Sequence, residues 1–125
     1  MKSTLLRISF IFLFLSLMVV GCEKEKLPPV CGIDDPLDKI SWLKELKINL
    51  EGDVGISSAE IILYQWNNID YIYVQKTISS AYDFPNVVFD CEGNVKYTCG
   101  GNQPIDNCST FFLEARKIKT LWEKE

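Results

Sequence analysis

The stretch Ile61–Val74, IILYQWNNIDYIYV, decides the fold because it holds two apolar strands and the turn that joins them. The central pair Asn67-Asn68 suits a two-residue hairpin turn, since asparagine tolerates the positive φ that such a turn requires. Two cross-strand pairs then share one side of the hairpin: Leu63 with Ile72, and Ile61 with Val74. The opposite side collects larger residues: Ile62, Tyr64, Trp66, Tyr71 and Tyr73. A slip of one residue would scramble this sorting, so the pattern predicts the register.

The aromatic side of this hairpin is a candidate binding face, made of Tyr64, Trp66, Tyr71 and Tyr73. If it lies open, it forms a contiguous apolar patch of a kind that soluble proteins rarely leave without a partner. Flat aromatic surfaces suit sugar rings or a protein partner, because Trp and Tyr contribute strongly to binding energy. In the alternative interpretation a helix covers this side, and the aromatic residues belong to the core.

A second hairpin is predicted around Asp90-Cys91-Glu92-Gly93, which has Asp and Gly where a type I turn with a glycine bulge prefers them. Pairing Asp90 with Asn94 sets two apolar pairs on one face: Phe89 opposite Val95, and Val87 opposite Tyr97. The other face then holds Asn86, Val88, Lys96 and Thr98.

An amphipathic helix is predicted from Asp35 to about Leu50. Asp35 can cap it, Pro36 fits its first turn, and Asp38 lies where a carboxylate favours the positive helix end. Its apolar positions recur at helical spacing: Leu37, Ile40, Trp42, Leu43, Leu46 and Leu50. The aspartates lack the spacing of a calcium-binding loop, so no metal site is predicted.

The C-terminal segment has both helical and strand spacing. We predict a helix over 109–116 and then an edge strand through Trp122, although residues 117–123 also fit a helix. The predicted fold class is therefore α+β. An N-terminal helix packs on a small antiparallel sheet of two hairpins, with a C-terminal helix and edge strand, and disulfides staple the whole.

Four cysteines are available for disulfides: Cys31, Cys91, Cys99 and Cys108. An even number of cysteines in an exported chain indicates paired thiols. Cys91 lies in the turn and Cys99 several residues along its strand at ~3.3 Å each, too far for a bridge that needs Cα atoms within ~7 Å. Either Cys31 pairs with Cys91 and Cys99 with Cys108, or Cys31 pairs with Cys99 and Cys91 with Cys108. The glycine-rich loop 100–107 favours the first arrangement.

Residues 1–21 have the pattern of a secretory signal peptide: basic residues, then an apolar run, then a small residue before Cys22. The run falls short of the ~20 residues that a spanning helix needs. The junction resembles the lipobox of bacterial lipoproteins, in which the cysteine thiol receives diacylglycerol and the new amino group is acylated. Cys22 is then the first mature residue and the lipid anchor, 22–30 is a tether, and 31–125 is one globular domain.

Composition excludes several classes of function. The chain contains no histidine, which excludes catalytic triads and histidine metal sites. Removal of the signal peptide leaves 11 basic and 17 acidic residues, a net charge of −6, which disfavours nucleic acid as a partner. The remaining candidate acids are scattered at turns: Asp70, Asp83, Asp90 and Glu92. We predict neither an enzyme nor a cofactor.

A set of short motifs carries a family resemblance: Cys31-Gly32, Trp42-Leu43-Lys44-Glu45-Leu46, Asp90-Cys91-Glu92-Gly93-Asn94, Gly100-Gly101, Cys108 and Leu121-Trp122-Glu123. The set resembles a family of small cysteine-containing lipoproteins of Bacteroidota, a domain of unknown function. In that family the second hairpin cysteine often lies two residues earlier, at the position of Tyr97 here, which leaves the connectivity open. The resemblance implies a place at the outer membrane or cell envelope, periplasmic or surface-facing, and no activity.

The predicted function is a non-catalytic binding module at the bacterial envelope, attached to the membrane through Cys22. Its partner would be a glycan or an envelope protein. The alternative is a small disulfide-stabilised inhibitor or envelope-assembly protein that acts through a loop, either 78–85 or 100–107.

Overall fold

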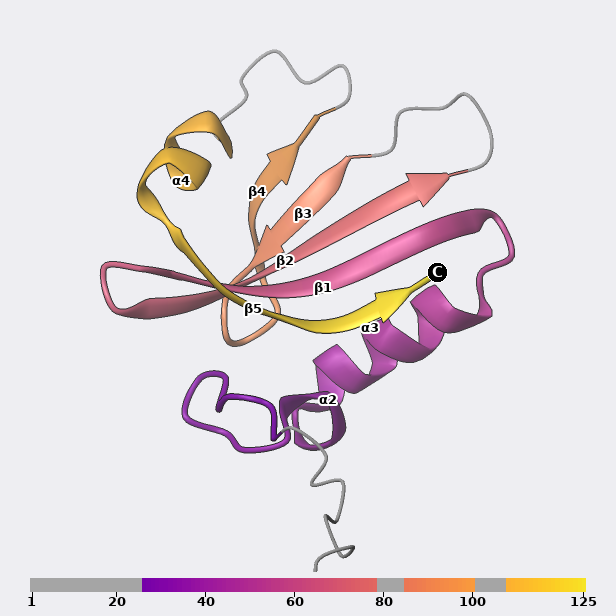
Figure 1. The fold of residues 1–125 in the computed structure, drawn as a ribbon, viewed down its shortest axis with the longest axis horizontal. Helices are drawn as coiled ribbons and strands as arrows, with labels where there is room; N and C mark the ends of the chain where they lie inside the picture. Colours follow the sequence, from indigo (N-terminus) through magenta and orange to yellow (C-terminus); the bar gives the residue numbers. More distant parts are fainter. Residues whose placement is uncertain (1–25, 79–84, 101–107) are drawn as a thin grey trace, which may run out of the picture.

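The computed structural model describes residues 26–78, 85–100 and 108–125. They form a five-stranded antiparallel sheet with helices on both faces (Figure 1). The elements are α2 (Pro36–Lys39), α3 (Ser41–Gly52), β1 (Ile56–Trp66), β2 (Ile69–Ile78), β3 (Asn86–Phe89), β4 (Val95–Cys99), α4 (Cys108–Glu114) and β5 (Arg116–Lys124). The strand order is β4-β3-β2-β1-β5, with α2 and α3 on one face and α4 on the other. The mixed helix and sheet class is confirmed, as are two disulfides.

The first hairpin, β1–β2, has the predicted register. Leu63 pairs with Ile72 and Ile61 pairs with Val74. The turn residues Asn67 and Asn68 have φ values of 51° and 61°, the left-handed conformation that a two-residue hairpin turn requires. The two faces of this hairpin belong to two separate cores. Alternate side chains along the strands therefore point either towards α3 or towards α4.

The second hairpin, β3–β4, has the predicted turn but not the predicted register. Phe89 pairs with Val95 as expected, whereas the pairing of Val87 with Tyr97 is wrong. A bulge inserts Lys96, so the next pairs are Val88 with Tyr97, Val87 with Thr98 and Asn86 with Cys99. A bulge places two residues against one and exchanges the faces beyond it. Val88 and Tyr97 therefore join the core under α4, while Phe89 packs on the α3 side.

The single helix predicted from Asp35 to Leu50 is wrong, because the chain breaks between α2 and α3. Ile40 adopts an extended conformation (φ −87°, ψ 104°) and is only 7% exposed, so the break lowers its side chain into the core. Asp35 does not cap α2 through its side chain; it has φ 53°, and its carbonyl oxygen accepts hydrogen bonds from the N–H groups of Asp38 and Lys39.

The core between α3 and the sheet is aliphatic. Leu43 and Leu50 of α3 pack with residues from three adjacent strands, among them Ile61, Ile72 and Leu121. Val30 is completely buried and Leu27 packs against the same core, so the end of the predicted tether belongs to the folded domain.

The C-terminal ambiguity resolves as a helix followed by a strand. The helix α4 covers 108–114, and β5 runs antiparallel beside β1 as an edge of the sheet. At the far end of β5 the Lys124 ammonium donates hydrogen bonds to the carbonyl oxygens of Leu50 (3.1 Å) and Asp53 (2.9 Å). A cation there complements the negative end of the α3 dipole, so Lys124 connects the edge strand to α3.

Candidate functional site

The four aromatic residues of the candidate face do lie together, but they are covered by α4. Tyr73 is 8% exposed, and Tyr64, Trp66 and Tyr71 are half-buried. Phe111 of α4 is 1% exposed and packs among their rings, with centroid distances of 5.6 Å to Tyr64, 6.0 Å to Trp66 and 5.6 Å to Tyr71. An open aromatic face is therefore not what the structure contains. The structure agrees with the alternative interpretation, in which a helix covers these rings.

Two links attach the ends of α4 to the sheet. At its start, Cys108 is bonded to Cys99 at the end of β4, with Cα atoms 5.5 Å apart. At its end, Trp66 Nε1 donates a hydrogen bond to Glu114 Oε2 (2.9 Å). The sequence alone did not place Phe111 against the hairpin. The pairing of Cys99 with Cys108 carried the signal, because it brings the following helix to the end of β4.

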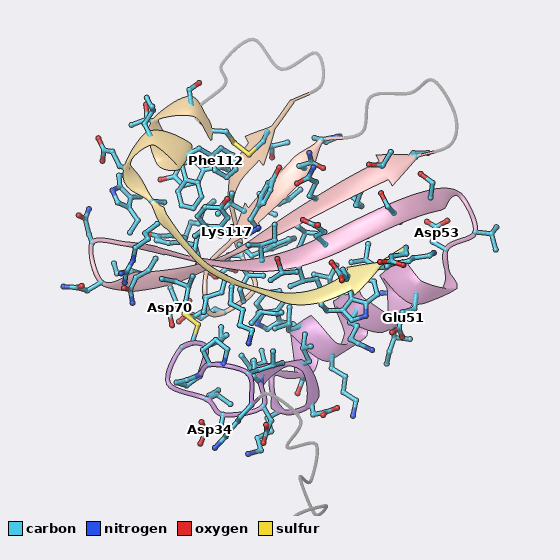
Figure 2. The ribbon with its side chains drawn as sticks, in the orientation of Figure 1. Asp34, Glu51, Asp53, Asp70, Phe112 and Lys117 are labelled. Atoms are coloured by element: carbon cyan, nitrogen blue, oxygen red, sulfur yellow. A yellow bond between two sulfur atoms is a disulfide. The ribbon has the colours of Figure 1, made fainter. Side chains whose placement is uncertain are left out.

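Phe112 of α4 (Figure 2) packs against Phe111, with ring centroids 5.2 Å apart. It is 36% exposed and packs edge-to-face on Tyr73, with ring centroids 4.9 Å apart. Burial raises the pKa of Tyr64, and the nearby Glu60 charge raises it further. Burial is also the largest effect on the pKa of Tyr73 and raises it. The hydrogen bond with Asn86 opposes burial by a smaller amount, and Tyr64 and the Glu60 charge add still smaller increases. Both phenols are therefore neutral donors at physiological pH.

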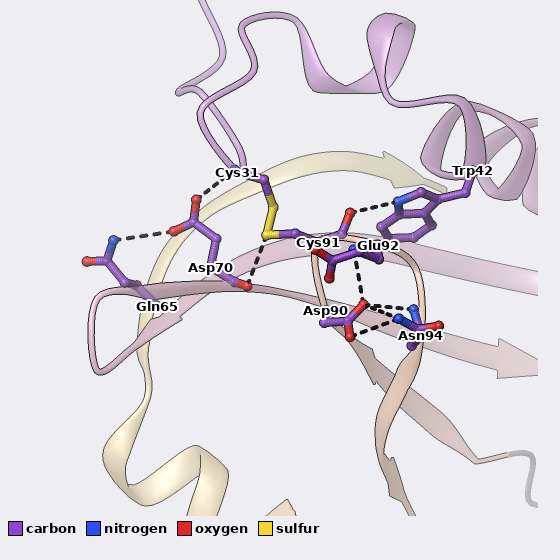
Figure 3. The surroundings of a disulfide bond; sticks show 8 residues. All are labelled: Cys31, Trp42, Gln65, Asp70, Asp90, Cys91, Glu92 and Asn94. Carbon is purple, nitrogen blue, oxygen red and sulfur yellow. Dashed lines mark hydrogen bonds between the residues drawn. A yellow bond between two sulfur atoms is a disulfide. The ribbon is translucent and has the colours of Figure 1, made fainter.

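The second constellation is the corner around the Cys31–Cys91 disulfide (Figure 3). The Cα atoms of the two cysteines are 5.8 Å apart, which confirms the favoured connectivity. The Cys31 N–H donates a hydrogen bond to Asp70 Oδ2 (2.8 Å), and Trp42 Nε1 donates one to the Cys91 carbonyl oxygen (3.1 Å). The N-terminal segment, the β1–β2 hairpin, α3 and the β3–β4 turn thus meet at this corner.

Asp90 organises the β3–β4 turn. Its Oδ1 accepts hydrogen bonds from the N–H groups of Glu92 (3.0 Å) and Asn94 (2.8 Å), and Lys96 Nζ lies 3.2 Å from Oδ2. Desolvation of the carboxyl raises its pKa, but the hydrogen bonds from Asn94 and Lys96 and the Lys96 charge outweigh it. Together they lower the pKa of Asp90 from 3.8 to about 2. This carboxylate supports the turn rather than serving as an acid or base near neutral pH.

The low pKa of Asp90 predicts an acid-dependent loss of stability. The unfolded chain binds the Asp90 proton at the ordinary pKa of 3.8, whereas the folded chain binds it only near 2. The contribution of Asp90 is therefore complete above about pH 4 and lost as the pH falls to about 2. The difference in melting temperature between wild type and Asp90→Asn is expected to narrow over this interval. Glu92→Gln, a neighbour in the same turn, is the control, and a pH-independent difference for Asp90→Asn would contradict this role.

Gly93 lies under the Trp42 ring, and its replacement is expected to be costly. It has φ +85°, and a Cβ there would lie 2.8 Å from Trp42 Cδ2. Gly93→Ala is expected to lose about 1–2 kcal/mol for the left-handed backbone and about 1–3 kcal/mol more for displacing the indole. Gly100→Ala is the matched control, since Gly100 has φ +81° with nothing within 4 Å of a Cβ. Equal losses in urea unfolding of the two variants would refute the Trp42 contact.

The other predicted residues are placed as follows. Cys22 and Asp83 lie outside the described residues, as do 79–84 and 101–107, most of the two candidate loops. Asp70 and Asp90 both accept hydrogen bonds that hold the chain together, and Glu92 is exposed. Within the described ranges no group of three or more Cys, Asp or Glu residues could hold a metal ion. No helix in that part of the chain is long and apolar enough to span a membrane.

Comparisons with known proteins give no family for this chain. No family model matches it, no curated protein sequence matches it, and no solved structure matches it.

Proposed function

We propose that this chain is a lipid-anchored extracytoplasmic protein, of the kind represented by small Bacteroidota lipoproteins, and that its domain is a non-catalytic binding module at the bacterial envelope. Cys22 carries the lipid at the outer membrane or cell envelope, and the segment after it leads into the domain at Val30.

The observation that carries this proposal is the pair of disulfides. Cys31–Cys91 joins the N-terminal segment to the β3–β4 turn, and Cys99–Cys108 joins the sheet to α4. Structural disulfides persist in oxidising compartments outside the cytoplasm. An exported domain is what the signal-peptide pattern of residues 1–21 implies independently. The carboxylates of Asp70 and Asp90 are occupied in holding the fold, which favours binding over catalysis.

Lipid attachment is tested by labelling with radioactive palmitate in a bacterial host. Wild type is expected to incorporate label and to sediment with membranes, because several acyl chains on one residue anchor stably. Cys22→Ser is expected to lose the label, whereas the neighbouring substitution Glu23→Gln keeps it. Label retained in Cys22→Ser would refute the anchor.

The second candidate function is a small inhibitor or envelope-assembly protein that acts through a loop. The Cys99–Cys108 disulfide favours it, since this bond closes the chain between β4 and α4 into a loop of sequence separation 9. Saturable binding to a protease, abolished by substitutions within 101–107, would distinguish this function from a module that binds through its sheet.

A further inference from the structure

A groove lies at the end of the sheet that α4 leaves uncovered. It is formed where β1 begins and where β2 and β5 end, and it encloses about 300 Å³. The side chains that give it its chemistry are Ser58, Glu60, Gln75, Thr77, Glu123 and Glu125. Apart from Ala59 the residues that line it are polar, and the groove offers charge and hydrogen bonds beside the apolar contact of their hydrocarbon parts.

Two acidic residues of the groove lie directly opposite each other on neighbouring strands. Glu60 of β1 pairs in register with Glu123 of β5, and on its other side with Gln75 of β2. Like charges directly opposite in a sheet are destabilising. Such a local conflict is expected where a sequence serves binding rather than stability alone.

The glutamates of the groove, Glu60, Glu123 and Glu125, have no ion-pair partner in the part of the chain that the structure describes. Lys124 lines the groove, but its ammonium is turned towards the end of α3, 2.9 Å from the carbonyl oxygen of Asp53. The Glu60 charge also adds to the effect of burial in raising the pKa values of the half-buried Tyr64 and the buried Tyr73.

We infer that this groove binds lysine or arginine side chains in a basic segment of a partner protein. This inference rests on the proposed binding function and assigns its ligand chemistry. A lysine ammonium has three donors and no acceptor. Glu60 and Glu123 can share it from two strands, and the amide oxygen of Gln75 supplies a third acceptor. The volume falls at the lower limit of small-molecule sites, which are mostly apolar, so a side chain suits it better than a compact organic ligand.

The test measures binding of fluorescein-labelled hexalysine by fluorescence anisotropy, with the full-length protein purified in non-ionic detergent. Binding is expected in wild type and should weaken as salt screens the charges. Glu60→Gln and Glu123→Gln are each expected to weaken it by about threefold to fivefold. Glu45→Gln, which removes an exposed carboxylate on α3, is the matched control and should leave binding unchanged.

A second readout is the melting temperature of the protein without peptide. Glu123→Gln removes the repulsion from Glu60 and is expected to raise the melting temperature by about 1–5 °C. A folded, stabilised variant with weakened hexalysine binding supports the inference. Unchanged binding in the Glu60→Gln, Glu123→Gln double variant overturns it, as does a failure of wild type to bind hexalysine.

The same variants distinguish two negative results: that the groove does not bind basic side chains, and that the domain is not a binding module. Immobilised wild type and the double variant are exposed in parallel to solubilised envelope extract. A component retained equally by both overturns the groove while the binding function stands. If neither protein retains any component, the proposed function fails as well.

Discussion

Phe111→Ala is expected to lower the free energy of unfolding by about 3–5 kcal/mol. Phe111 is among the largest fully buried side chains of the described residues and is 1% exposed. Its ring contacts four aromatic rings of the sheet: Tyr64, Trp66, Tyr71 and Tyr97. Because α4 spans only seven residues, its position depends on this packing rather than on intrinsic helix stability.

Urea unfolding of Phe111→Ala checks the loss, with Leu113→Ala as the matched control. Leu113 belongs to the same short helix but is 86% exposed, so its truncation should change stability by no more than about 0.5 kcal/mol. A loss in Leu113→Ala as large as that in Phe111→Ala would show that helix propensity, and not packing on the aromatic rings, holds α4 in place.

The same variant tests whether the aromatic face is core. Removing the Phe111 ring should expose Trp66, whose ring centroid lies 6.0 Å from it in the wild type. The Trp66 fluorescence, obtained as the difference between proteins with and without Trp66→Phe, should move to longer wavelength and become accessible to acrylamide. An already red-shifted, fully quenched Trp66 in wild type would contradict the cover provided by α4.

The first hairpin could be predicted from sequence because several local signals agree there. The turn pair Asn67-Asn68 fixes the register, and a slip of one residue would exchange the two faces. The second hairpin was predicted less well, because its register depends on the single inserted residue Lys96. The alternation of polar and apolar residues does not predict a bulge. The bulge nevertheless moves Tyr97 from the side of Phe89 to the α4 side.

At the candidate site, the residue pattern predicted which side chains lie together but not which element covers them. The aromatic residues were grouped correctly, because alternation along a strand specifies which side chains share a face. Alternation does not specify what covers that face. The cover here comes from Phe111, a residue distant in the sequence, brought there by the Cys99–Cys108 disulfide. The Glu60–Glu123 pair depends likewise on β5 adding beside β1, and on two bulges that set its register.

Removing the Cys31–Cys91 disulfide with paired serine substitutions is expected to destabilise the protein by about 4 kcal/mol, and removing Cys99–Cys108 by about 2.5 kcal/mol. The order follows from loop closure, since the sequence separations are 60 and 9 and the longer loop frees more conformations in the unfolded chain. Urea unfolding of the two double variants measures the order directly.

Removing the two disulfides should also change the unfolding of the protein in different ways. Without Cys99–Cys108 the start of α4 loses its covalent link to β4, so an apolar dye should bind the uncovered rings before global unfolding. Without Cys31–Cys91 the corner formed by Cys31, Asp70 and Trp42 keeps its hydrogen bonds, and the domain should still unfold in one cooperative step at lower urea. Early dye binding by the variant lacking Cys31–Cys91 would mean that this bond, and not Cys99–Cys108, keeps the aromatic rings covered. We therefore expect Cys31–Cys91 to stabilise mainly by restricting the unfolded chain, and Cys99–Cys108 also to determine whether the folded domain exposes its aromatic rings.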